Sequence, residues 1–149
     1  MKPQCALLGL AIAAGASPAA EPAAKEAEAL VEQGAAFLRA RGRAELIRRI
    51  NGRDPMFYRG GLYLHLRDAR TGITLAHPVH PWMIGQDLAD LPDANGKKYR
   101  RDIVELAATR GKGWVHYTYK NPADGRAEPR SDYITRVGDL VLESGLEKP

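Results

Sequence analysis

The sequence predicts an α+β domain in which helices pack against one antiparallel sheet. Hydrophobic residues recur with helical spacing over residues 25–50 and again over 97–109, and segments of strand-like alternation follow each of these regions. The turns between neighbouring strands are short, and short turns join antiparallel strands. The order of helix, helix, two strands, loop, helix and three strands therefore indicates the α+β class.

The N-terminus has the pattern of an export signal. Lys2 gives a positive start, and residues 5–16 form an apolar run that is shorter than the roughly 20 residues of a membrane span. Small residues at Ala14 and Ala16 fit cleavage after residue 16, with Ala20 as an alternative position. We expect a signal peptide at 1–16, a flexible leader at 17–26 and one domain at 27–147. The alternative is an uncleaved anchor or a disordered alanine-rich tail.

Composition narrows the class of protein. Cys5 lies inside the expected signal, so the mature domain would contain no disulfide and would depend on its core. No later segment reaches membrane-spanning length, so we expect no membrane span in the mature chain, which would be periplasmic or otherwise exported. The net charge is +4, and the arginines between residues 39 and 53 are spaced around a helix with acids nearby, such as Glu45. This pattern favours a solvated helix face over nucleic-acid binding.

Three helices are expected along the chain. The first begins at Lys25 and ends near Gly42, and the second covers 44–50 and ends at Asn51 and Gly52. The third covers 97–109, with Gly111 at its C′ position. The first helix has apolar residues on one side, namely Leu30, Val31, Ala35 and Leu38.

Five strands are expected, at 62–67, 73–77, 114–120, 130–137 and 140–146. In the first of them the leucines face one way, while Tyr63, His65 and Arg67 face the other. Turns at 68–72, 121–126 and 138–139 join neighbouring strands, and residues 78–95 are rich in loop-forming residues.

Seven sequence blocks follow one another in a family-specific order. They are DARTG at 68–72, LAHP at 75–78, GQDL at 85–88, DLPDANGK at 90–97, GWVHY at 113–117, EPRSDY at 128–133 and VGDLV at 137–141. With this order and spacing, residues 27–147 resemble the single Cache domain, type 2. Such domains are PAS-like extracytoplasmic sensors of bacterial chemoreceptors and kinases, and they also occur as free-standing exported proteins.

The resemblance implies a PAS-like Cache fold with a long N-terminal helix on a five-stranded antiparallel sheet. It also implies a pocket between the sheet and the segment that joins the second and third strands. Short organic acids such as acetate, propionate, pyruvate and lactate are the implied ligands. Two positions depart from the family pattern, since Arg130 stands where relatives commonly have lysine and His116 where an acid is expected. Both departures add positive potential.

Arg130 is the first candidate for binding an anion. Its guanidinium can hold a carboxylate through two parallel hydrogen bonds, although a surface salt bridge with Glu128 or Asp132 is the alternative. Tyr117 and Tyr119 lie two residues apart and therefore share one face of a strand. Each offers an apolar wall and a hydroxyl donor, and we expect one of the two to serve core packing instead.

Five further residues complete the expected pocket. His77 would donate a hydrogen bond from the end of the second strand, and Tyr63 would add a hydroxyl from the first. Trp114 points away from the tyrosines and either lines the pocket or covers the sheet. Trp82 and Met83 would form an apolar lid.

Metal and catalytic sites are not expected. His77 and His80 have the H-x-x-H spacing, but Pro78 and Pro81 argue against the helix that would align them. No cysteine or carboxylate cluster is apparent nearby. Residues 93–96 are typical of a turn that caps the next helix, not of a calcium loop. No serine lies in a nucleophile elbow.

We therefore expect an exported, soluble sensing or binding domain without enzymatic activity or cofactor. Its ligand would be a small organic acid, and because no output module is apparent, a separate membrane receptor or kinase would be its partner. The alternatives are a ligand-free Cache-like module that binds another protein, and a metal-dependent enzyme that uses His77 and His80.

Overall fold

The computed structural model describes residues 20–121 and 123–147. The expected signal peptide at 1–16 and the first residues of the expected leader lie outside this range. Within the described range, none of the helices combines the length and the apolar character needed to cross a membrane.

Three α-helices form, at the places that the periodicity predicts. They are α1 (Ala20–Arg41), α2 (Arg43–Asn51) and α3 (Tyr99–Thr109), and a short 3-10 helix, η1 (Pro81–Met83), lies in the long loop. The flexible leader expected up to residue 26 is wrong in part, because α1 already begins at Ala20. Alanine, glutamate and lysine dominate this stretch and favour helix, and Pro22 falls in the first turn, where proline is tolerated.

The sheet is antiparallel and has six strands, one more than expected. The strands are β1 (Tyr58–Arg59), β2 (Leu62–Asp68), β3 (Thr74–Ala76), β4 (Lys112–Lys120), β5 (Ala127–Val137) and β6 (Leu140–Glu147). Their order is β1-β2-β6-β5-β4, with β3 paired to β2. The additional strand is the two-residue β1, which pairs with β2. The last strand along the described chain therefore lies between β2 and β5.

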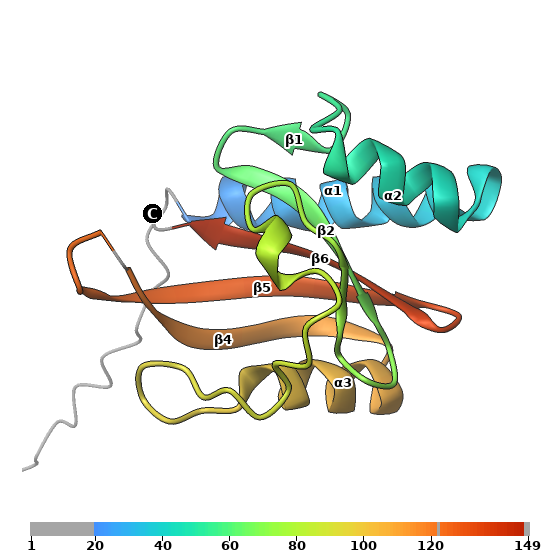
Figure 1. Cartoon of the computed structure of the whole chain (residues 1–149). Helices are drawn as coiled ribbons and strands as arrows, with labels where there is room; N and C mark the ends of the chain where they lie inside the picture. Colours follow the sequence, from blue (N-terminus) through green and yellow to red (C-terminus); the bar gives the residue numbers. More distant parts are fainter. Residues whose placement is uncertain (1–19, 122, 148–149) are drawn as a thin grey trace, which may run out of the picture.

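Helices cover both faces of this sheet (Figure 1). On one face α1 packs against the leucines of β2 and β6. The fit is close at Gly34, where an added Cβ would lie 2.5 Å from Leu64 Cδ2 and 2.9 Å from Leu142 Cδ2. On the other face Ile103 of α3 joins a smaller apolar cluster with Val115 and other strand residues. That second cluster covers only part of its face and leaves room beside α3.

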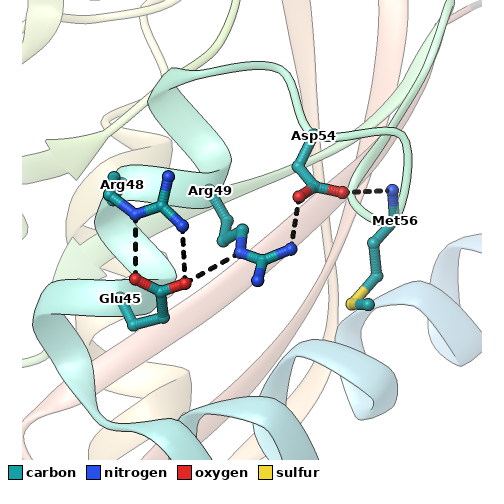
Figure 2. Close-up of polar contacts among 5 residues, drawn as sticks. All are labelled: Glu45, Arg48, Arg49, Asp54 and Met56. Atoms are coloured by element: carbon teal, nitrogen blue, oxygen red, sulfur yellow. Dashed lines mark hydrogen bonds and ion pairs between the residues drawn. The ribbon is translucent and has the colours of Figure 1, made fainter.

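The arginines of α2 form the solvated, ion-paired face that was expected (Figure 2). Glu45 accepts hydrogen bonds from Arg48 at 2.7 and 2.9 Å and from Arg49 at 2.9 Å. Arg49 also binds Asp54 at 2.7 Å, and Asp54 accepts a bond from the backbone N–H of Met56. Hydrogen bonds from Arg48 and then Arg49 lower the pKa of Glu45 to about 2. The network connects the end of α2 to the loop that leads into β1.

Candidate ligand-binding site

A cavity of about 430 Å³ lies on the face of the sheet that α3 partly covers. Its walls come from β2, β4, β5 and β6, from the start of α3, and from residues 77–94 of the segment that joins β3 to α3. This is the place where the family resemblance puts a pocket. Concave sites of this size are typical for small ligands.

An ion pair between neighbouring strands forms part of the cavity wall. Arg67 of β2 donates to Glu143 of β6 through Nε at 2.9 Å and Nη2 at 3.2 Å, and its Nη1 donates to the carbonyl of Gly72. The two side chains are 3% and 0% exposed. Burial alone would raise the pKa of Glu143, but Arg67 outweighs it, so the pKa lies below its ordinary value. Glu143 is therefore an anion, and its charge is already balanced.

A second buried carboxyl group lies beside this pair. Asp132 of β5 is 4% exposed, and the hydroxyl of Tyr117 donates to its Oδ1 at 3.4 Å. A side chain at Gly145 on the adjacent strand would collide with this carboxyl, so the glycine leaves the space that Asp132 fills. Burial, reinforced by Glu143, raises the pKa of Asp132 well above its ordinary value.

Three histidine rings follow one another along the cavity wall. The rings of His65 and His77 are 4.8 Å apart between centroids, and those of His77 and His80 are 5.0 Å apart. Burial lowers the pKa of His65 to about 4 and that of His77 to about 2, so both are neutral at pH 7. The backbone N–H groups of Val79 and His80 donate to Nδ1 of His77. The neutral ring of His77 therefore carries its hydrogen on Nε2, as the predicted donor role requires.

Two guanidinium groups belong to the cavity in addition to Arg67. Arg130 lies with its Cζ 4.7 Å from the ring centroid of Tyr119, and its Nη2 is 3.5 Å from Glu128. Arg100, from the first turn of α3, is 6% exposed and lies 4.4 Å from the ring centroid of Tyr99. Its buried Nε has no hydrogen-bond partner among the described residues. Burial lowers the pKa of Arg100. This cation is placed to interact with an anion.

Stacked tyrosines form the apolar part of the same wall. The rings of Tyr99 and Tyr117 are parallel to within 5°, with centroids 4.0 Å apart. Burial raises the pKa of Tyr99 to about 12 and that of Tyr117 well above 10. Both hydroxyls therefore keep their hydrogen at neutral pH and can act as donors.

The structure brings most of the predicted pocket residues together. Those that line the cavity are Arg130, Tyr117, Tyr119, His77, Tyr63, Trp82 and Met83. Trp82 is 63% exposed, whereas Met83 is buried.

Trp114 is the exception among the predicted residues. It lies on the opposite face, 5.4 Å from the ring of Tyr133, and its Nε1 donates to Glu28 of α1 at 3.0 Å. Of the two roles considered for it, covering the sheet is the one observed. His116 is exposed and bonds Ser131 on β5 at 2.7 Å, and it is not among the residues that line the cavity.

Sequence reasoning missed five buried polar residues of the cavity. They are His65, Arg67, Arg100, Asp132 and Glu143. A signal existed for two of them, since alternation already placed His65 and Arg67 on the face of β2 that carries Tyr63. Asp132 and Glu143 gave no such signal, because the sheet register brings them together.

The expectation that no carboxylate cluster lies near the histidines is wrong. His65, Asp132 and Glu143 each offer one ligand atom, and these atoms lie within 4.8 Å of one another. A metal ion could use these three groups only in competition with Arg67, whose guanidinium binds both oxygens of Glu143. The arrangement therefore favours binding of an organic anion near the cations over binding of a metal cation.

The loop at residues 93–96 is a turn, as expected, but it does not cap α3. Asp93 accepts bonds from the backbone N–H groups of Asn95, Lys97 and Thr118. The N-cap of α3 is Lys98, which makes no side-chain capping bond. Asp93 thus connects the loop to β4 at the edge of the cavity.

Comparisons with known proteins agree on one family. The family model for single Cache domain 2 matches residues 28–139. A methyl-accepting chemotaxis protein from Vibrio parahaemolyticus has 20% sequence identity and a TM-score of 0.69, over 86% of this chain and 90% of that one. A periplasmic sensor domain of a chemotaxis protein has 27% identity and a TM-score of 0.67, over 90% of this chain and 100% of that one. A Cache chemosensory domain studied for carboxylic acid recognition has 20% identity and a TM-score of 0.63, over 87% and 90%.

Proposed function

This chain belongs to the single Cache domain 2 family, and on that premise we propose that it is an exported sensor domain for a short-chain carboxylate. The acetate, propionate, pyruvate and lactate type of acid fits a cavity that combines cations with aromatic walls. The observation that carries the proposal is Arg100, a buried cation that has no carboxylate oxygen of the described residues within ion-pair distance. A buried charge without a counter-ion is costly, and a bound anion removes that cost.

The proposed contacts divide between the two ends of the ligand. Arg100 and Arg130 supply the positive charge for the carboxylate, and the Tyr117 hydroxyl donates a hydrogen bond to it. Met83 and Trp82 enclose the short alkyl part from the β3–α3 segment. One of the solved neighbours recognises carboxylic acids, which supports the same ligand class here.

Export and a separate signalling partner are part of the same proposal. The signal-like pattern at residues 1–16 supports export, as does the periplasmic location of a neighbour that is 27% identical. Since chemotaxis proteins recur among the neighbours, a membrane receptor or kinase is the partner that we propose.

A thermal-shift screen with C2–C4 carboxylic acids tests the proposal. A ligand that binds only the folded state at 100 times its Kd stabilises it by about 2.7 kcal/mol. Arg100→Ala and Arg130→Ala should abolish the shift, whereas Arg136→Ala should preserve it, because Arg136 lies on the same strand as Arg130 but is exposed and away from the cavity. If none of the acids stabilises the protein, or if the first two variants respond like the unaltered protein, the proposal fails.

A ligand-free protein-interaction module is the alternative. Trp82 and Leu91 at the cavity favour it, because they are 63% and 49% exposed. This alternative predicts that no acid binds and that Trp82→Ala together with Leu91→Ala abolishes binding to another exported protein. Metal analysis of the purified protein tests the remaining alternative, a metal-dependent enzyme built on the histidines.

A further inference from the structure

Two buried carboxyl groups lie in the cavity, and only one of them is paired with a guanidinium group. Asp132 and Glu143 lie on adjacent strands, each with an oxygen within 4.8 Å of the other, and both are buried. Arg67 binds both oxygens of Glu143, and no hydrogen bond joins it to Asp132 among the described contacts. Two like charges this close in a buried site are not both ionised. Because Glu143 has the counter-ion, Asp132 is the group that keeps a proton. In the ligand-free protein a side-chain hydrogen bond joins this acid to Glu143, so a bound carboxylate has to replace Glu143 as the acceptor of the Asp132 proton.

Asp132 takes part in none of the ion pairs among the described residues. The charged and titratable groups that line the cavity around it are Tyr63, His65 and Arg67 of β2, His77, His80 and Asp93 of the β3–α3 segment, Tyr99 and Arg100 of α3, Tyr117, Tyr119 and Lys120 of β4, Arg130 of β5 and Glu143 of β6. Burial keeps His65 and His77 neutral, as their lowered pKa values show. Tyr117 donates to Asp132 from one side. Arg67 is engaged by Glu143.

From this geometry we infer that Asp132 is a ligand-binding residue that donates its carboxylic proton to the carboxylate of the bound acid. The inference rests on the proposed function. It adds a contact in which the uncharged, protonated side chain of Asp132 binds the carboxylate of the ligand. Gly145 leaves the space that the Asp132 carboxyl occupies at the cavity wall, beside the Tyr117 hydroxyl. Once the Tyr117 hydroxyl turns its hydrogen from Asp132 to the ligand, Asp132 and Tyr117 would both donate to the anion that Arg100 attracts.

Proton balance gives the inference a distinct pH dependence. Short carboxylic acids ionise near pH 4–5, so above about pH 6 the ligand arrives as an anion. Binding takes up no proton while Asp132 is protonated. Once Asp132 ionises in the free protein, binding requires uptake of one proton, and the affinity falls by about tenfold per pH unit. The acid is therefore bound more tightly in acidic surroundings than in alkaline ones.

Calorimetric titration of the full chain with propionate, between pH 6 and pH 10, tests this dependence. The unaltered protein should lose affinity as the pH rises through the ionisation of Asp132. Asp132→Asn keeps a hydrogen-bond donor but cannot ionise, so its affinity should remain constant over the same range. Asp132→Ala removes the donor and should weaken binding about 10- to 100-fold at pH 6. A variant Asp132→Asn that retains the full pH slope would overturn the inference while leaving the proposed function intact.

Infrared difference spectroscopy of the ligand-free protein tests the proton itself. The spectrum at pH 7 should contain the carbonyl band of a buried protonated carboxyl group, and Asp132→Asn should remove this band. If the band is absent, the proton assignment is wrong, whatever the titration shows. If the band is present but none of the C2–C4 acids binds at pH 6, the proposed function and the donor role both fail.

Discussion

Replacement of Arg67 by methionine should destabilise the protein in a strongly pH-dependent way. The variant Arg67→Met leaves Glu143 buried without its counter-ion, which costs about 3–5 kcal/mol if the carboxylate stays charged. Protonation of Glu143 limits this cost to about 1.4 kcal/mol for each pH unit above its ordinary pKa of 4.5. The expected loss is therefore about 3 kcal/mol at pH 7 and below about 1 kcal/mol at pH 5.

The sign of this pH dependence follows from the direction of the pKa change. In the variant, burial raises the pKa of Glu143 in the folded state above its value in the unfolded chain. A carboxyl group with a raised folded-state pKa contributes stability at low pH, and this stability is lost as the pH rises. At about 3–5 °C per kcal/mol for a domain of this size, Tm should fall by about 10 °C or more at pH 7.

Urea denaturation monitored by circular dichroism at pH 5 and pH 7 measures the effect. The double variant Arg67→Met with Glu143→Leu should recover most of the lost stability, because an apolar pair of similar volume replaces the ion pair. Arg48→Met is the matched control, since Arg48 also binds a glutamate through two nitrogens but does so at the surface. An equal loss for Arg67→Met at both pH values, or a double variant as unstable as the single one, would refute the reasoning.

Three further predictions concern the core, the buried histidines and Trp82 at the cavity. Gly34→Ala should destabilise by about 1–2 kcal/mol, because crowding against Leu64 outweighs the gain in helix propensity; an unchanged urea midpoint would contradict this. The lowered pKa values of His65 and His77 predict stability that is present above pH 6.5 and lost as the pH falls towards 4, and His77→Gln should flatten that part of the Tm profile. Propionate should alter tryptophan fluorescence through Trp82, and a signal that persists in Trp82→Phe would place the ligand elsewhere.

The elements of the fold were predictable from local patterns, and the errors lie at their ends. Alternation in β2 correctly separated the leucines, which face α1, from the polar side chains, which face the cavity. β5 starts at Ala127, three residues before the predicted strand, because pairing with Tyr119 and Lys120 of β4 extends the hairpin past Pro129. β1 was not predicted because a two-residue strand forms only through its partner.

Residues of the candidate site were predictable only where they lie on one strand or within one short sequence block. Tyr117 and Arg130 are paired across the β4–β5 hairpin. This pairing was predictable because a short turn joins the two strands. Glu143 meets Arg67, 76 residues away, and this contact depends on the register between β2 and β6. Arg100 reaches the cavity because of where α3 packs, which helical periodicity does not specify. Contacts that depend on tertiary register lie beyond what residue patterns can indicate.

The central place of β6 has a consequence for how the chain folds. A ribosome makes β2 long before β6, yet β2 and β5 are joined only through β6. The β4–β5 hairpin can form early because its strands are neighbours in sequence. By contrast, the edge of β2 that pairs with β6 stays unpaired until residues 140–147 are available. Closing such a long loop is slow because its entropy is lost before the contacts form. The cavity should therefore be among the last parts to assemble as the chain folds, and an incomplete chain that ends before β6 should bind no acid.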